Sequence, residues 1–128
     1  MKNDTEYMKG FSTVSRRGFY RPEGEMSAGQ TVDMITAVLA LARTRKMQEM
    51  LISLTRLSGF DVPGPAFRRW AVRRWAGAAE GVHVAVVARA EHICPQKTGL
   101  LVAAEEGLRA EVCQTEAAAL AWLDEASS

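Results

Sequence analysis

The chain has 128 residues and a mass of 14.0 kDa, which is the length of one domain that buries a sizeable core without disulfide bonds. With 48% hydrophobic and 24% charged residues, its composition excludes a disordered or fibrous protein. The 16 Lys and Arg residues against 15 Asp and Glu residues exclude a general polycation for nucleic acid, but not a local basic patch.

The amino-terminal segment, residues 1–10, carries mixed charges with no apolar stretch behind them. It therefore lacks the pattern of a secretory signal. No run approaches the roughly 18 apolar residues that a membrane span needs, so we expect no membrane span. Cys94 and Cys113 are expected to be reduced thiols. We predict a cytoplasmic protein with a ragged N-terminus over 1–10 and a single domain over 11–125.

The first predicted elements are a hairpin and a helix. Phe11–Val14 and Phe19–Arg21 contain β-favouring residues on either side of a turn over Ser15–Gly18, as expected of a hairpin at a sheet edge. Ser27 followed by Gln30 predicts a capping box at a helix start. The helix should then run from 28 to 45, with one apolar stripe along it.

The rest of the chain alternates between strands and helices. Its apolar runs predict strands covered on both faces, and Thr98, Gly107 and Thr115 mark helix ends. The order ββαβαβαβα predicts an α/β sandwich, with a mostly parallel sheet, an antiparallel edge hairpin and about four flanking helices. The predicted strands are Met50–Leu54, Val82–Ala88 and Ala110–Cys113, and the predicted helices are Phe67–Ala79, Thr98–Glu106 and Glu116–Asp124.

Ligand sites in sheets of this kind lie beyond the carboxyl ends of the parallel strands. The loops Thr55–Gly64, Arg89–Lys97 and Gln114–Thr115 should therefore share one rim, where any binding site is to be sought. The polar and charged candidates on this rim are Arg56, Ser58, Asp61, Arg89, Glu91, His92 and Lys97.

An arginine-rich stretch, FRRWAVRRW over 67–75, forms most of the second predicted helix. At 100° per residue, Arg69 and Arg73 point away from the apolar face, while Arg68 flanks it. Guanidinium groups form forked bonds to carboxylate or phosphate, and Trp70 offers a face for stacking. Residues 64–102 hold six basic and two acidic residues, whereas residues 103–128 hold one basic and six acidic. The alternative is that these arginines pair with the acidic C-terminal helices while the tryptophans anchor the core.

His92 and Cys94 lie close in the predicted rim, and a thiolate beside an imidazole is a known type of nucleophile. A gap of one residue in a loop supplies neither a positioned base nor a third group that orients it. With Glu91 they are also too few for a metal site. We therefore predict no catalytic residue, no metal and no cofactor.

Six strings, spread over most of the chain, carry a resemblance to known proteins. They are RPEGEMS (21–27), LISLTRLSGF (51–60), VAVVARAE (84–91), PQKTG (95–99), AAEEGL (103–108) and ALAWL (119–123). Together they resemble STAS domains, and more closely an SpoIIAA-like bacterial branch of that anti-sigma-factor-antagonist family. In that family a loop after a strand carries Asp, two hydroxyl residues and Gly, and a kinase phosphorylates one hydroxyl. The loop here reads Asp61, Val62, Pro63, Gly64, so the resemblance implies the fold and a non-enzymatic role without the phosphorylatable Ser or Thr.

Two functional hypotheses follow. The first is a regulatory or protein-interaction module that meets an acidic protein partner or a second copy of itself, forming a homodimer. The alternative is a binder of a small hydrophobic or anionic, lipid-like ligand at the carboxyl ends of the strands, with its anionic group held by Arg56, Arg68 or Arg89. Nucleic acid is disfavoured, because no recognised nucleic-acid fingerprint accompanies the basic helix.

Overall fold

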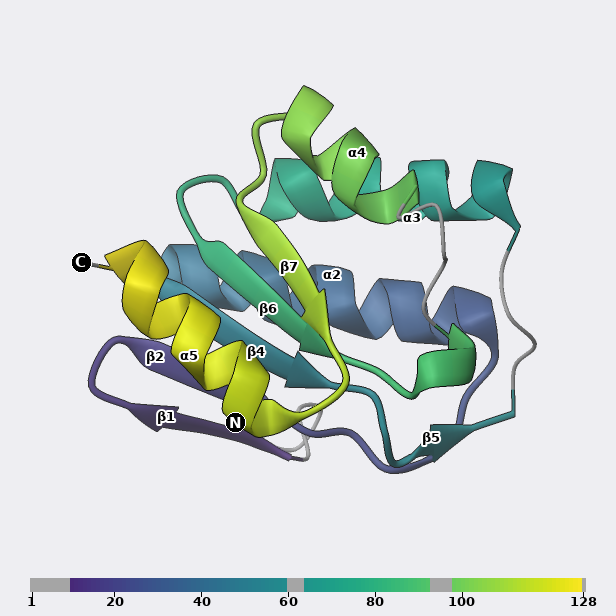
Figure 1. The fold of residues 1–128 in the computed structure, drawn as a ribbon, viewed down its shortest axis with the longest axis horizontal. Coiled ribbons are helices and arrows are strands. Elements are labelled where there is room, and N and C mark those ends of the chain that lie inside the picture. Colours follow the sequence, from purple (N-terminus) through teal and green to yellow (C-terminus); the bar gives the residue numbers. More distant parts are fainter. Residues whose placement is uncertain (1–9, 60–63, 93–97, 128) are drawn as a thin grey trace, which may run out of the picture.

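A computed structural model describes residues 10–59, 64–92 and 98–127. In these ranges, β1 (Phe11–Val14) pairs antiparallel with β2 (Arg17–Tyr20), whereas β2, β4 (Glu49–Ser53), β6 (His83–Val87) and β7 (Ala110–Cys113) are mutually parallel. The predicted α/β fold, a mostly parallel sheet with an antiparallel edge hairpin, is confirmed. The sheet order is β1, β2, β4, β6 and β7 (Figure 1).

Helices cover both faces of the sheet (Figure 1). One face carries α2 (Ala28–Thr44), α3 (Pro65–Ala78) and α4 (Thr98–Glu105), and the other carries α5 (Glu116–Ser127). Every residue of β4 is buried, as the unbroken apolar run predicted for a central strand. None of the helices in the described ranges is both long and apolar enough to cross a bilayer.

Most of the residues predicted to mark helix ends do so in the structure. At the start of α2 the Gln30 amide N–H donates to the Ser27 hydroxyl over 3.1 Å, and the Ser27 N–H donates to the Gln30 side chain over 2.8 Å. At α5 the Ala118 N–H donates to the Thr115 hydroxyl over 3.1 Å. Gly107 has the positive φ of a helix end, 79°. Thr98 differs, because it is the first residue inside α4 rather than its N-cap.

The hairpin turn is tighter than predicted, because β1 and β2 are joined by Ser15 and Arg16 alone. Gly18, expected in the turn, is buried inside β2. A Cβ atom there would collide with the Met50 side chain of the neighbouring strand. This glycine is therefore explained by close packing between strands rather than by turn geometry.

Other boundaries also shift. The short parallel pair β3 (Gly24–Glu25) and β5 (Leu57–Ser58) was not predicted, because two-residue strands carry no periodic signal. Helix α3 begins two residues earlier than expected, with Pro65 in its first turn, where proline's missing N–H is harmless. Cys113, expected to be buried, is half-buried beside the α5 cluster.

Two arginines tie the hairpin to α5. Arg17 Nε donates to Glu49 over 2.6 Å and its second nitrogen donates to Asp124 over 2.7 Å. These bonds, the one to Glu49 foremost, raise the pKa of Arg17. Arg21 makes a forked pair with Glu116 over 2.8 and 2.9 Å, and this pair lowers the pKa of Glu116.

Candidate functional site

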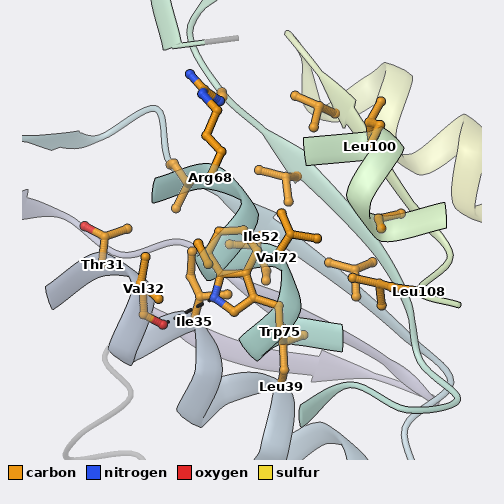
Figure 2. Close-up of a pocket in the computed structure, with 18 of the residues that line it drawn as sticks. Thr31, Val32, Ile35, Leu39, Ile52, Arg68, Val72, Trp75, Leu100 and Leu108 are labelled. Carbon is orange, nitrogen blue, oxygen red and sulfur yellow. Dashed lines mark hydrogen bonds between the residues drawn. The ribbon is translucent and has the colours of Figure 1, made fainter. Parts of the chain in front are cut away.

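An apolar pocket lies between the sheet and the three helices on its α2 side (Figure 2). Strands β4, β6 and β7 form its floor, α2 and α4 form its sides, and α3 forms its roof. Its principal lining side chains are Ile52, Val84, Val86 and Val112 on the floor, Val32, Ile35, Leu39, Leu100 and Ala103 on the sides, and Ala71, Val72 and Trp75 on the roof.

The local sequence patterns explain how these side chains meet. Val32, Ile35 and Leu39 follow helical spacing and share one face of α2. Val84 and Val86 alternate along β6, so both point to the same face of the sheet. Helix α3 packs mainly on α2 and α4 rather than on a strand. The pocket is therefore the space left where α3 spans two other helices without reaching the sheet.

The pocket has a volume of about 170 Å³. An apolar protein cavity of about 150 Å³ stays dry and accommodates a benzene-sized molecule. The space is accordingly suited to a single ring or a short hydrocarbon chain, and too small for a long acyl chain.

Two polar groups of the pocket lining, those of Thr31 and Trp75, are already bonded to the protein. The Thr31 hydroxyl donates to the Ser27 carbonyl over 2.9 Å, and the Trp75 indole N–H donates to the Val32 carbonyl over 3.3 Å (Figure 2). With these donors satisfied, the pocket presents the Thr31 methyl and the flat Trp75 ring to any occupant, both of which are apolar.

A positive charge lies at the pocket edge. The Arg68 guanidinium points away from the apolar side chains (Figure 2) and donates to the His92 carbonyl over 3.0 Å. This bond joins the start of α3 to the 3₁₀ turn Ala90–His92 that follows β6. The structure thus brings together two predicted site residues, Arg68 and His92, at a pocket that includes the carboxyl ends of β4 and β6.

The outer surface of α3 carries the exposed residues of the arginine-rich stretch. Trp70 is 45% exposed, and its ring lies 5.3 Å from the Phe67 ring and 5.2 Å from the Arg74 guanidinium carbon. Arg74 also pairs with Asp33 of α2 over 2.6 Å. Trp70 is therefore held in a fixed aromatic and cationic setting on the surface instead of anchoring the core.

Arg69 and Arg73 are exposed on the same outer surface, as the helical spacing predicted. Arg73 lies 3.9 Å from Glu106, at the end of α4. An exposed pair at this distance contributes little stability. The predicted alternative was that the arginines pair with the acidic C-terminal helices. It holds for Arg73, which pairs with Glu106, but not for Arg74, which pairs with α2.

The other candidates are dispersed. Arg56 pairs with Glu23 over 2.8 Å beside the small β3–β5 sheet, on which Ser58 is exposed. Arg89 donates to the Leu57 carbonyl over 3.0 Å. These contacts place Arg56 and Arg89 in loop structure rather than in the lining of the apolar pocket.

Part of the predicted rim lies outside the described residues. This holds for Asp61, Lys97 and Cys94, and for the side chain of Glu91. Within the ranges that the structure describes, no three His, Cys, Asp or Glu side chains gather closely enough to hold a metal ion.

The sequence did not predict the pocket wall formed by Trp75, Leu100 and Leu108. Trp75 lies on the face of α3 that packs on the core, and that face also borders the pocket. The sequence held one weak indication of a pocket. The stretch Pro65–Ala78 contains four arginines and few large apolar side chains, so this helix has little apolar surface to pack against the sheet.

Comparisons with known proteins add structural likenesses only. No family model matches the chain, and no curated protein is similar to it in sequence. The anti-sigma factor antagonist SpoIIAA, in its unphosphorylated form, matches with a TM-score of 0.48 and 17% identity, over 89% of this chain and 96% of that one. A crystal structure of Mglu matches with a TM-score of 0.44 and 20% identity, over 66% of this chain.

This chain spans only 21% of the Mglu chain. SpoIIAA belongs to the group that the sequence strings resemble. Because both TM-scores are below 0.5 and neither identity exceeds 20%, these likenesses assign neither a family nor a function to the chain.

Proposed function

We propose that this chain is a non-enzymatic binding module that takes a small, largely apolar molecule with an anionic end. The observation that supports this function is the apolar pocket beneath α3, with the Arg68 side chain at its edge. Pockets that bind small molecules combine an apolar lining with a few placed polar groups, and they lie at strand ends in α/β folds.

The ligand class follows from size and charge. A volume of about 170 Å³ accommodates one aromatic ring or a short acyl chain, as judged from the roughly 150 Å³ cavity that holds benzene. The Arg68 guanidinium, which is permanently charged, suits a carboxylate at the edge. An aromatic or short-chain carboxylate therefore fits better than a long-chain lipid.

The pocket is partly open to solvent, and a movement of α3 would widen it. Ala71 and Val72 are the fully buried residues of this helix and both are small, whereas Trp75 packs on the core only partly buried, so modest apolar contact holds the roof in place. A slight tilt of α3 would widen the pocket while the sheet and α5 keep their positions.

The proposal is tested by titrating the protein with phenylacetate and with neutral ethylbenzene, followed by calorimetry and by NMR shifts of pocket amides. We expect Val72→Phe to abolish binding of both probes. Arg68→Met should weaken phenylacetate binding about tenfold, the effect of one charge-assisted hydrogen bond, with ethylbenzene unchanged. The matched control is Arg69→Met, one residue along but on the outer surface.

Equal binding of both probes to wild-type protein and to Arg68→Met would contradict the assigned role of Arg68. Unchanged binding in Val72→Phe would contradict the pocket itself. Circular dichroism of each variant establishes that loss of binding does not reflect loss of fold.

A second candidate function is docking of an acidic protein partner on the outer surface of α3. Its support is the exposed Trp70, since tryptophan and arginine are the residues that most often dominate binding surfaces. Charge reversal of Arg69 and Arg73 together should abolish recovery of a partner in a pull-down. Sedimentation of the pure protein separates this outcome from self-association, which would persist without any other protein.

A further inference from the structure

A second hollow lies at the amino-terminal ends of β2 and β4. It is formed by the β1–β2 turn and by the C-terminal end of α2, which lie side by side before β2 and β4 begin. Three of its side chains are cationic and two are hydroxyls, and none of the described residues that line it is acidic. They are Thr13, Ser15, Arg16, Arg45, Lys46 and Met47.

Two of these lining residues have an unusual backbone. Within the described residues, Ser15 with φ 55° and Lys46 with φ 58° are the non-glycine positions of positive φ. Ser15 begins the two-residue turn, where glycine is favoured in a type II′ turn. Lys46 follows the last turn of α2, where glycine is again the usual residue.

Stability alone does not account for these two residues. A side chain in the left-handed region is strained relative to glycine, and strained positions gather where a function needs the side chain. Ser15 and Lys46 come from different elements, yet both line the same hollow. One supplies a hydroxyl and the other an ammonium group.

The dipole of α2 gives a partial alternative explanation. Cations near the C-terminal end of a helix interact favourably with its last carbonyls. Arg43 already stands in the last turn of α2. The dipole explains neither the lysine at a position that favours glycine nor Arg16, which belongs to the hairpin turn.

The backbone amides at this helix end are occupied. The Arg45 N–H donates to the Leu41 carbonyl, the Lys46 N–H to the Arg43 carbonyl and the Met47 N–H to the Ala42 carbonyl. Binding by this hollow must therefore come from side chains. Three cations with two hydroxyls match a doubly charged anion that accepts several hydrogen bonds.

We propose that this hollow binds a phosphate-bearing group. Arg16, Arg45 and Lys46 supply the positive charge, and the hydroxyls of Ser15 and Thr13 donate to the remaining phosphate oxygens. The site is separate from the apolar pocket, so the two can be occupied independently.

The test uses the full chain and two sources of phosphate. Inorganic phosphate is titrated by calorimetry and NMR at constant ionic strength, with chloride as the reference anion. Vesicles of phosphatidylcholine with and without phosphatidic acid are tested by co-sedimentation. Binding of free phosphate assigns a soluble ligand, and binding only to phosphatidic acid vesicles assigns a lipid headgroup; either result supports the site if Lys46→Gly weakens it.

The decisive variant is Lys46→Gly, because it relieves backbone strain while it removes a charge. We expect it to unfold at a higher temperature than wild type and to bind phosphate or phosphatidic acid vesicles about tenfold more weakly, the effect of one charge-assisted bond. Ser15→Gly should shift both properties in the same directions by less. The matched control is Arg109→Gln, an exposed arginine that does not line the hollow, with unchanged binding.

Phosphate binding that is unchanged in Lys46→Gly would overturn the proposal, whatever the variant's stability. Absence of binding to both phosphate sources, or NMR shifts centred on Arg68 instead of the hollow, would overturn it equally.

Discussion

The two faces of the sheet are built differently. On the α5 face, Leu51, Ala85, Leu123 and their neighbours form a small, fully buried cluster, and ion pairs from Arg17 and Arg21 hold α5 to the hairpin. On the other face a larger cluster surrounds a pocket of about 170 Å³. One face therefore provides close packing, whereas the other leaves room for a ligand.

The difference comes from how many helices share each face. A single helix, α5, lies directly on β4, β6 and β7 and fills the grooves between their side chains. Three helices crowd the opposite face, and α3 rests on α2 and α4 rather than on the sheet. A helix held away from the sheet by its neighbours leaves space beneath it, and the two fully buried side chains that α3 turns toward this space, Ala71 and Val72, are small.

The largest expected effect comes from the same substitution, leucine to alanine, made on each of the two faces of the sheet. Leu123→Ala empties a closely packed site, since Leu123 is 0% exposed, and should lower the free energy of unfolding by about 2–5 kcal/mol. Leu100→Ala, beside the existing pocket, should lower it by about 1 kcal/mol, because the half-buried leucine has fewer contacts to lose. Urea unfolding measures both, and equal losses would contradict the asymmetry.

A second effect concerns Arg17, which pairs with Glu49 of β4 and with Asp124 of α5. Arg17→Met leaves the Glu49 carboxylate, 9% exposed, without its partner, and the Glu49 Oε2 atom accepts no hydrogen bond from the described residues. Loss of about 2 kcal/mol is expected, less than for a fully buried pair because Arg17 is partly solvated.

The double variant Arg17→Met, Glu49→Gln should recover most of that loss, since no unpaired charge is left buried. Failure of the double variant to recover stability would indicate that packing of the arginine stem, rather than charge, is what matters.

Filling the pocket should act in the opposite direction. Val72→Leu adds one methylene group to the roof above an existing space and should raise the free energy of unfolding by about 0.5–1 kcal/mol. The same change should weaken phenylacetate binding. Loss of stability would instead mean that α3 closes the pocket in solution, which would remove the distinction between the two faces.

The smallest effect depends on pH. Because Arg21 lowers the pKa of Glu116 from its usual 4.5, the pair stabilises the fold above about pH 4.5 and this contribution is lost as pH falls through the lower pKa of the folded protein. Arg21→Met should cost about 0.5–1 kcal/mol at pH 7, since both side chains are more than a third exposed.

The difference between Arg21→Met and wild type should shrink as pH falls below 4.5 and vanish once the pH lies below the lowered pKa of Glu116 in the folded protein, because Glu116 is then protonated in both the folded and unfolded states. Thermal unfolding across the pH range measures it, and a difference that persists at low pH would assign the effect to the contact between Arg21 and the Phe19 ring.

Sequence reasoning succeeded where the signal is local. The capping box of Ser27 and Gln30, the Thr115 cap and the outward direction of Arg69 and Arg73 depend on residues within one or two helical turns of each other. It failed where the choice of residue depends on a contact with a residue that is distant in the sequence. Gly18 was assigned to a turn because its close contact with Met50, on another strand, leaves no mark in the nearby sequence.

The candidate sites show the same contrast between features that nearby residues predict and features that depend on distant contacts. Arg68 was singled out from its helix alone, but its bond to the His92 carbonyl depends on how helix α3 meets the turn that follows β6. The basic hollow joins residues 13–16 with residues 45–47. Neither segment predicts it alone.

The sequence by itself determined the alternation of strands and helices, the covering of the central strands and the charge on α3, because apolar periodicity and capping are properties of neighbouring residues. Only the tertiary structure decided that α3 stands off the sheet and that cations from two elements meet at one hollow. Both features depend on the spacing between packed elements, which is set by side-chain sizes far apart in the chain.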